Sequence, residues 1–488
     1  MAGTVPILSV EAARALEEAR FGGDEAREWP AMVQAGQAIA REVERDAGEI
    51  GGLPADARFL VLAGKGHNGG DALLAAAGLL ARCPGARADV VLAFGERSLR
   101  PLAARAWRDL VQAAAGRVQV TSEFRPAGYD LCLDGLFGFQ FRPPVEPPIA
   151  DLIARVNALP VRLRAAVDLP SAGLFRADFT YATGSVKAPV VAAPEAGRVR
   201  YLDLGFFRGD EPGAERVLTR AVLAPLAGLR PVQSDKRSYG HVFIVGGSRS
   251  YPGAILMSVL AALHSGAGLV TAFVPESLVA AFAARAPEAM WVGWPETPAG
   301  GLALEGEHLL RTRLERASAL VLGPGLGREP ETLALARSVV EAATVPLVID
   351  ADALQPDIVT AGNAARILTP HAGEFARLAG GRALRDCAAE VRATVVLKGA
   401  VTQVATPDRV VYHSFFGGPL LARGGSGDLL AGLTGGLLAQ TPGDPALAAA
   451  RGVVWHGRAA DLAARVRGQA SIRVTQLLDF LPAALREH

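Results

Sequence analysis

One sequence pattern constrains the fold more than any other: short apolar runs end in glycine or polar residues and are followed by helical stretches. Its first instance is Phe59–Ala63, which precedes the glycine-rich run Gly64–Asp71 and an Ala/Leu-rich helical segment. Strand, glycine loop and helix form the opening of a βαβ unit. The pattern predicts further strands at residues 88–94, 118–120, 129–133, 164–167, 188–192, 200–203, 241–245, 269–274, 319–322, 346–349, 367–371 and 394–397. Strands that alternate with helices indicate an α/β fold with mostly parallel sheets covered by helices on both faces.

The chain is too long for a single ordinary core. It has 488 residues, of which 50% are hydrophobic, so two domains are expected. The alternating pattern breaks at residues 220–235, a stretch that contains two prolines and lacks a clear period. We therefore predict an α/β domain at residues 1–220 and a second α/β domain at residues 221–488.

The charge balance and the cysteine content limit which partners and which cellular compartment are expected. Fifty Lys and Arg balance 49 Asp and Glu, which gives no electrostatic reason to expect nucleic acid or an anionic membrane as partner. No apolar stretch is long enough to suggest a membrane span, and the first ten residues lack the features of a signal peptide. Three scattered cysteines without CxxC spacing favour a reducing compartment. We expect a cytoplasmic enzyme that acts on small molecules. We also expect a homo-oligomer, which the apolar, Ala-rich helices permit.

The run Gly424–Gly432 carries the strongest chemical signal. Its glycines let the backbone approach an anion closely, and the helix that follows directs free N–H groups at that anion. Asp428 falls in the first helical turn, where it can act as a base for a substrate hydroxyl. The combination indicates phosphoryl transfer to an alcohol. The alternative is a glycine-rich turn with an Asp cap, because short motifs also occur without function.

Three polar clusters follow predicted strands in the N-terminal half: residues 66–71, 134–138 and 168–173. Ligands of open α/β sheets bind at the carboxyl ends of the strands. Asn68, Asp134 and Ser171 supply oxygen atoms, which suit a hard cation. Each cluster taken alone is also typical of a turn.

The N-terminal motifs resemble those of the NAD(P)HX epimerase domain, the YjeF N-terminal family. The matching blocks are His67-Asn68-Gly69-Gly70-Asp71, Asp134-Gly135-Leu136-Phe137-Gly138, Val167-Asp168-Leu169-Pro170-Ser171, and Ala177 to Thr180 with Thr183 and Lys187. The resemblance implies a Rossmann-like domain with K⁺ near Asn68, Asp134 and Ser171. It also implies a catalytic role for Asp168 and contacts to the hydrated cofactor from Asn68, Gly69, Gly70, Asp71, Gly138, Arg142 and Asp168.

The C-terminal motifs resemble those of the ADP/ATP-dependent NAD(P)HX dehydratase, which has a ribokinase-like fold. The matching blocks keep one order along the chain: Gly246 to Ser248, Tyr251 to Ala254, Gly323 to Gly327, Asp350 to Leu354, Thr369 to Glu374, Lys398 to Thr402, and Gly424 to Asp428. The resemblance implies contacts to the hydrated cofactor from Ala254, Gly325, Gly327, His371 and the catalytic Asp428. It places the adenine nucleotide at Lys398, Gly399, Ala400, Val401, Thr402, Gly425, Ser426 and Gly427.

Together the two resemblances imply a bifunctional enzyme, an isomerase fused to a lyase. The first half would interconvert R- and S-NAD(P)HX, and the second would dehydrate the S form by phosphorylating its C6 hydroxyl with ADP or ATP and Mg²⁺. Whether NADHX or NADPHX is preferred stays open. Two alternatives also stay open: a kinase for a small alcohol, since this fold supports several acceptors, and an N-terminal half that only binds or scaffolds.

Overall fold

The computed structural model describes residues 1–209 and 211–486, which form two compact units. The N-terminal unit comprises Val5–Pro212 with Ala464–Gln469. The C-terminal unit comprises Met1–Thr4, Gly213–Ala463 and the chain from Ala470 onward. Within the described residues, no helix is both long and apolar enough to cross a membrane. The predicted two-domain α/β class is confirmed, while the functional boundary at residue 220 stays a prediction.

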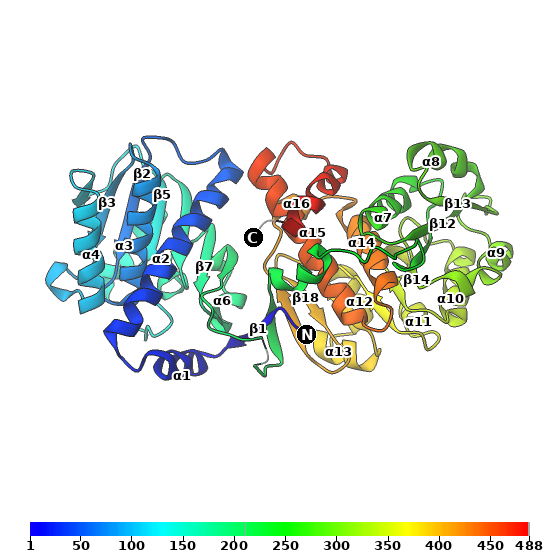
Figure 1. Cartoon of the computed structure of the whole chain (residues 1–488), viewed down its shortest axis with the longest axis horizontal. Coiled ribbons are helices and arrows are strands. Elements are labelled where there is room, and N and C mark those ends of the chain that lie inside the picture. The colour runs from blue at the N-terminus through cyan, green and yellow to red at the C-terminus, as the bar shows by residue number, and fades with distance from the viewer. Residues whose placement is uncertain (210, 487–488) are drawn as a thin grey trace. The chain divides into compact units, whose positions relative to one another are not determined.

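The N-terminal unit is built on seven parallel strands (Figure 1). Their order is β4-β3-β2-β5-β6-β7-β9. The bounds are Arg58–Ala63 for β2, Arg87–Leu92 for β3, Val118–Val120 for β4, Tyr129–Gly135 for β5, Val161–Val167 for β6, Phe179–Thr183 for β7 and Arg198–Leu202 for β9. The chain reverses its direction of travel across the sheet between β4 and β5. Such a switch point is where open α/β sheets bind ligands.

Alternating side chains of β2 bury both faces of this sheet. Phe59 and Val61 pack in one cluster with α2 (Glu25–Ala47), α3 (His67–Arg82) and α4 (Pro101–Ala113). Leu60 and Leu62 pack in the opposite cluster with α5 (Pro147–Asn157). In addition, β1 (Thr4–Leu8) pairs in parallel with β8 (Val186–Lys187). The short helix α1 (Val10–Phe21) buries only Ala13.

The C-terminal unit contains the parallel strands β13-β12-β11-β14-β15-β16-β17, followed by antiparallel β18. The bounds are His241–Val245 for β11, Leu269–Pro275 for β12, Met290–Trp294 for β13, Ala319–Leu322 for β14, Leu347–Ile349 for β15, Arg366–Leu368 for β16, Thr394–Leu397 for β17 and Thr402–Ala405 for β18. Next come β19 (Val411–Ser414), antiparallel to β18, and β10 (Glu215–Leu218), parallel to β19.

Small residues bring α14 (Ser426–Gln440) close to its neighbours, as Figure 1 shows beside α7 (Pro252–His264). A Cβ at Gly432 would lie 1.9 Å from the Ser258 carbonyl oxygen of α7. A Cβ at Gly435 would lie 2.1 Å from the Val321 side chain of β14. Helix α10 (Pro330–Ala342) packs Leu335 and its neighbours into another cluster with Leu320. Tight packing of α14 fixes its first turn relative to the strand ends.

Several sequence predictions are corrected by the structure. The apolar run at residues 188–192 is helix α6 (Ala188–Ala192) rather than a strand. Pro189 occupies the first helical turn, where it costs no hydrogen bond, and a short apolar run does not distinguish helix from strand by itself. Asp134 and Gly135 lie inside β5 instead of just after it. The predicted strand at 88–94 ends at Leu92.

Candidate functional site

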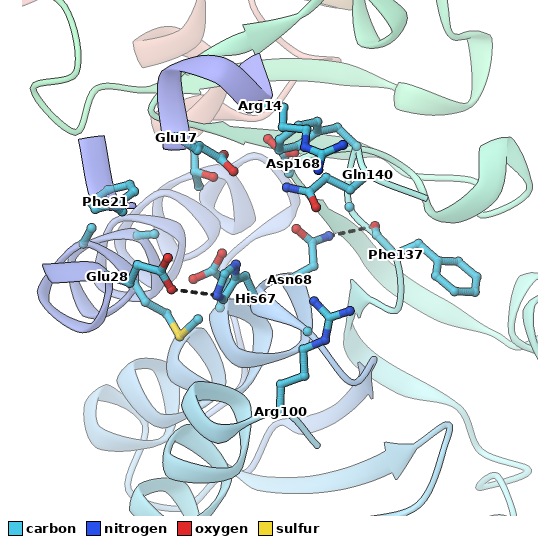
Figure 2. Close-up of a pocket in the computed structure, with 18 of the residues that line it drawn as sticks. Arg14, Glu17, Phe21, Glu28, His67, Asn68, Arg100, Phe137, Gln140 and Asp168 are labelled. Atoms are coloured by element: carbon cyan, nitrogen blue, oxygen red, sulfur yellow. Dashed lines mark hydrogen bonds and ion pairs between the residues drawn. The ribbon is translucent and has the colours of Figure 1, made fainter. Parts of the chain in front are cut away.

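A cavity of about 450 Å³ opens at the carboxyl ends of the N-terminal strands (Figure 2). Its floor is the start of α3, where Asn68 and Asp71 face the space. The loop after β5 contributes three aromatic side chains, Phe137, Phe139 and Phe141. Aromatic walls with a few converging polar groups are typical of small-molecule sites. The cavity therefore has the composition expected for a ligand with a flat ring.

Hydrogen bonds hold each of the three oxygen-bearing residues of the predicted cation site in place. The Ser171 hydroxyl donates to Asp134 Oδ1 at 2.6 Å, and its amide donates to Asp134 Oδ2 at 2.8 Å. Asn68 Nδ2 donates to the carbonyl oxygens of Phe137 and Val167, both at 2.8 Å. Burial raises the pKa of Asp134 to about 6, although hydrogen bonds from Ser171 and Leu136 lower it. In the described part of the chain, no side-chain cation pairs with this buried carboxyl.

Asp168 is held in an unusual backbone conformation at the end of β6. Its φ is 66°, a left-handed value that costs energy for a residue other than glycine. Its carboxylate forms an ion pair with Lys187 Nζ at 2.5 Å, and both side chains are buried. Lys187 also lies 5.0 Å from the centre of the Phe139 ring. The strained position and the buried pair indicate a residue that the fold holds firmly against the cavity.

The N-terminal residues predicted to contact the cofactor divide into two groups. Asn68, Asp71, Gly138 and Asp168 line the cavity. Gly69, Gly70 and Arg142 do not line it. The two glycines pack instead: a Cβ at Gly69 would lie 2.1 Å from the Gly64 carbonyl oxygen, and one at Gly70 would lie 2.9 Å from the Met32 sulfur.

In the C-terminal unit, α14 begins at the glycine motif. Gly425 is its N-cap and has φ 94°, a conformation that favours glycine. Asp428 lies in the first turn and is half-buried. Burial raises the pKa of Asp428 to about 7; Asp350 and Asp352 add to the shift and Lys398 opposes it. A carboxyl group with a pKa near neutral pH is suited to accept a proton from a substrate hydroxyl.

Lys398 faces this helix start from the end of β17. Its Nζ bonds to Asp350 Oδ1 at 3.0 Å and would lie 3.2 Å from a Cβ at Gly427. Burial lowers the pKa of Lys398, but the charges of Asp350, Glu374 and Asp428 and the hydrogen bond to Asp350 together outweigh burial, so the net shift is upward. Asp350 also accepts a hydrogen bond from Thr369 at 2.7 Å. A lysine held beside helical N–H groups is suited to bind phosphate.

The predicted cofactor contacts gather around the same strand ends. Gly325 has φ 65°, and a Cβ there would lie 3.0 Å from the Ala254 Cβ. The Gly327 amide donates to Asp352 at 3.2 Å. His371 is exposed and caps α12 (Ala372–Ala379), its Nδ1 accepting from the Gly373 amide at 3.0 Å. The backbone bridge between His371 and Lys398 brings this cap next to the lysine.

The predicted nucleotide residues lie on two neighbouring segments. Gly399, Ala400 and Val401 form the turn between β17 and β18, and Thr402 begins β18. Gly399 and Ala400 are exposed. Ser426 is the first residue of α14, and its hydroxyl donates to the Leu421 carbonyl oxygen at 2.6 Å. The Ser426 hydroxyl therefore already has a protein partner, whereas Gly399 and Ala400 of the turn are accessible to a ligand.

Sequence reasoning did not assign two residues that the structure places at the N-terminal cavity. Lys187 was matched to a family block but given no role, although it is the partner of Asp168. Glu17 was not singled out. Arg14, Glu17, Glu18 and Phe21 all line the cavity from one face of α1. Their helical spacing was visible in the sequence, but nothing there identified what that face would contact.

Two family models match the chain. The model described as YjeF-related protein N-terminus matches residues 30–194, and the model described as NAD(P)H-hydrate dehydratase matches residues 242–483. Both predicted family resemblances are thereby confirmed. The first range contains Asn68, Asp134, Asp168 and Ser171, and the second contains Lys398 and Asp428.

Relatives similar to the whole chain are bifunctional NAD(P)H-hydrate repair enzymes. The one from Moorella thermoacetica is 36% identical, with the alignment spanning 93% of this chain and 92% of the relative. The one from Gloeobacter violaceus is 39% identical and spans 93% of each. A Bacillus subtilis ADP/ATP-dependent NAD(P)H-hydrate dehydratase, co-crystallised with ATP/Mg²⁺, is 30% identical, with a TM-score of 0.49 over 55% of this chain and 96% of that chain.

Proposed function

The chain belongs to the family of bifunctional NAD(P)H-hydrate repair enzymes, and from this premise we propose how its two halves divide the work. Residues 1–220 interconvert the R and S epimers of NADHX and NADPHX. Residues 221–488 dehydrate the S epimer to NADH or NADPH with a nucleotide as co-substrate. The fusion is chemically sensible, because a dehydratase that accepts one epimer needs a supply from the other.

The observation that carries the dehydratase assignment is the position of Asp428 beside Lys398 at the start of α14. Asp428 accepts the proton of the C6 hydroxyl while the hydroxyl oxygen bonds to the terminal phosphorus of the nucleotide. Loss of the phosphate from C6 and of a proton from C5 then restores the ring double bond. Backbone N–H groups at Gly425 to Gly427 and the Lys398 ammonium stabilise charge on the transferring phosphoryl group.

The turn at residues 399–402 and the start of α14 form the nucleotide side of this site. We assign the donor as ADP or ATP. Mg²⁺ supplies charge neutralisation for the nucleotide phosphates when it is bound. Among the described residues no cluster of three or more His, Cys, Asp or Glu side chains forms a cage for a metal ion. An ion held mainly by nucleotide phosphates, with Asp350 and Asp352 nearby, fits this arrangement.

The epimerase half fits a K⁺ ion at Asn68, Asp134 and Ser171. The fit rests on the buried Asp134 carboxyl, which lacks a cationic side-chain partner among the described residues, and on the oxygen-rich groups around it. When bound, K⁺ supplies the compensating charge. We assign cofactor contacts to Asn68, Asp71 and Gly138, which line the cavity, with Asp168 as a catalytic group beside them. The cavity does not support the predicted contacts of Gly69, Gly70 and Arg142, because none of the three lines it.

Alternatives to this assignment are now less favoured. A kinase for a small alcohol would not require the N-terminal family match, and a purely scaffolding N-terminal half would not require a buried Asp168–Lys187 pair in a cavity. We further propose a cytoplasmic location and a homo-oligomer. The three cysteines, all free, support a reducing compartment.

The test is the recovery of NADH absorbance from a mixture of R- and S-NADHX with ADP or ATP, Mg²⁺ and K⁺. Complete conversion with one nucleotide supports both activities and identifies the donor. Conversion that stops when the S epimer is spent contradicts the epimerase assignment, provided that spontaneous epimerisation is slower than the assay. An absence of conversion by folded protein favours the small-alcohol kinase.

A further inference from the structure

The carboxyl group of Glu17 enters the N-terminal cavity from a helix that lies outside the family match. Helix α1 precedes residues 30–194, yet Figure 2 shows Glu17 projecting from it into the space that Asp168 also faces. The two carboxyl groups come from different walls, one from α1 and one from the end of β6. Glu17 therefore adds a carboxyl group to the cavity from a different wall than the predicted catalytic one.

The two carboxyl groups have different surroundings. Asp168 is paired with Lys187 at 2.5 Å. In the described residues, Glu17 is half-buried and has no hydrogen bond or ion pair. The charged groups that face it are Lys187 on β8, Asp168 after β6, Glu28 on α2 and Asp71 on α3. Glu28 is itself engaged with His67 at 3.1 Å.

These surroundings favour the protonated form of Glu17. Burial is the main cause that raises the pKa of Glu17 to about 7; the charge of Lys187 opposes it, and those of Asp168 and Glu28 add to it. Asp168, in contrast, has the Lys187 ammonium as a direct partner at 2.5 Å. Two carboxyl groups whose environments differ in this way can take opposite acid and base roles.

Inversion at C6 requires both roles. C6 carries a hydroxyl and is bonded to the ring nitrogen N1, so the hydroxyl can leave as water only if it gains a proton. A water molecule that adds to the other face must lose one. One group on each side of the ring satisfies both requirements without an external reactant.

We propose that Glu17 is the acid partner of Asp168 in the epimerase site, an inference that rests on the proposed epimerase function. Glu17 donates its proton to the C6 hydroxyl oxygen, the C6–O bond breaks, and the N1 lone pair forms the C6=N1 bond as water departs. A water oxygen then bonds to C6 from the opposite face, the π electrons return to N1, and Asp168 accepts the water proton. The reverse reaction exchanges the two roles, and no oxidation or reduction takes place.

The placement of α1 supports this role. Its C-cap Gly22 has φ 62°, and Arg20 donates to the Gly205 carbonyl oxygen at 2.7 Å. Phe21 packs edge-to-face on Phe206 with ring centres 5.9 Å apart. These contacts fix the C-terminal end of α1, and Glu17 lies about one helical turn before Arg20 and Phe21. The helix therefore positions the Glu17 carboxyl group, which has no direct partner among the described residues.

The test uses the full chain, a single purified epimer of NADHX and no nucleotide, so that dehydration cannot consume the substrate. The Glu17→Gln substitution should lower kcat for epimerisation by about 100-fold or more with little change in KM. Wild-type kcat should fall above about pH 7, where Glu17 loses its proton, and the variant should lack this alkaline limb. Glu17→Asp should restore part of the rate.

Glu11→Gln is the matched control, because Glu11 is an exposed residue of the same helix and does not line the cavity. It should keep kcat within about twofold of wild type, a margin small beside the 10²-fold or larger effect of losing an acid. Three results for Glu17→Gln would each overturn the acid role. They are a kcat within about threefold of wild type, an effect confined to a higher KM, and a kcat that still falls above about pH 7. A wild-type chain that leaves the single epimer unchanged would instead overturn the epimerase assignment, which is a different outcome.

Discussion

The two sites share one arrangement of charged groups but differ in how far their lysine side chain is exposed to solvent. In each unit, a carboxyl group with a pKa near 7 lies beside a lysine–aspartate ion pair: Glu17 with Lys187–Asp168, and Asp428 with Lys398–Asp350. The Lys187 side chain is 2% exposed, whereas that of Lys398 is 23% exposed and lies at the start of α14. The buried Lys187–Asp168 pair neutralises its own charge within the protein. The partly exposed Lys398–Asp350 pair leaves the lysine ammonium accessible to a ligand phosphate. The difference matches a reaction without a co-substrate and one that consumes a nucleotide.

Backbone conformation separates the two sites further. The C-terminal site is lined by main chain at Gly325, Gly327 and Gly425, all with positive φ. The N-terminal cavity is lined by aromatic and charged side chains. Main-chain N–H groups suit phosphates, and rings suit a flat heterocycle.

The largest effect should come from removing the base of the C-terminal site. Asp428→Asn should lower the nucleotide-dependent conversion of S-NADHX by about 10²- to 10⁴-fold, since the amide cannot accept the hydroxyl proton. Epimerisation by the same variant should be unchanged. Asp408→Asn, at an exposed position between β18 and β19, is the control for lost charge. Equal loss of both activities in Asp428→Asn would show that the sites are not independent.

Replacing the lysine of each ion pair should distinguish the buried Lys187–Asp168 pair from the partly exposed Lys398–Asp350 pair. Lys187→Met leaves the Asp168 carboxylate buried without its partner, which should lower the free energy of unfolding of the N-terminal unit by about 3–5 kcal/mol. Lys398→Met should cost less stability, because that pair is partly exposed, and should mainly weaken nucleotide binding. Denaturant unfolding and nucleotide titration measure the two quantities. Equal destabilisation by both substitutions would contradict the proposed contrast between a buried and a partly exposed ion pair.

The backbone of the glycine motif should show a position-specific effect. Gly425→Ala places a side chain at φ 94°, which costs about 1–2 kcal/mol, and its Cβ would lie 2.6 Å from the Met257 side chain. Nucleotide affinity measured by calorimetric titration should fall by about tenfold. Gly424→Ala is the matched control, since a Cβ at Gly424 would meet no described atom within 4 Å. Similar affinities for the two variants would argue against main-chain recognition at Gly425.

The two activities should respond to pH in opposite directions. Asp428 acts as a base, so dehydration should increase as pH rises to about 7 and then level off. Glu17 acts as an acid, so epimerisation should decrease above about pH 7. Each limb should change the rate by about tenfold per pH unit. Measuring kcat for both reactions on one preparation tests this, and parallel profiles would contradict the assigned roles.

Much of the framework was accessible from the sequence because most of the parallel strands are short, buried and apolar; the exposed β4 is an exception. The predicted strands at 118–120, 241–245, 319–322 and 394–397 match β4, β11, β14 and β17. The hairpin of β18 and β19 was not predicted, since its strands contain polar residues and pair antiparallel. Strand β1 was also missed, because its pairing partner β8 is only two residues long and lies far along the chain.

The site residues were predictable only where they lie in a short motif that follows a strand or begins a helix. Asp168 stands two residues before Pro170, and Asp428 directly follows Gly427, so both lie in recognisable runs. Glu17 stands in an ordinary charged helix, and its surroundings depend on Asp168 and Lys187, which lie more than a hundred residues away in sequence. Only the tertiary structure supplies that neighbourhood.

Helix α1 gives this enzyme a place where rate can be tuned separately from stability. It buries a single residue, Ala13, and most of its other side chains either face the cavity or are exposed. Substitutions along it therefore alter the chemistry that a bound ring encounters while leaving the central sheet undisturbed. Variation in α1 offers a low-cost route by which related enzymes can adjust the speed of the first repair step to that of the second.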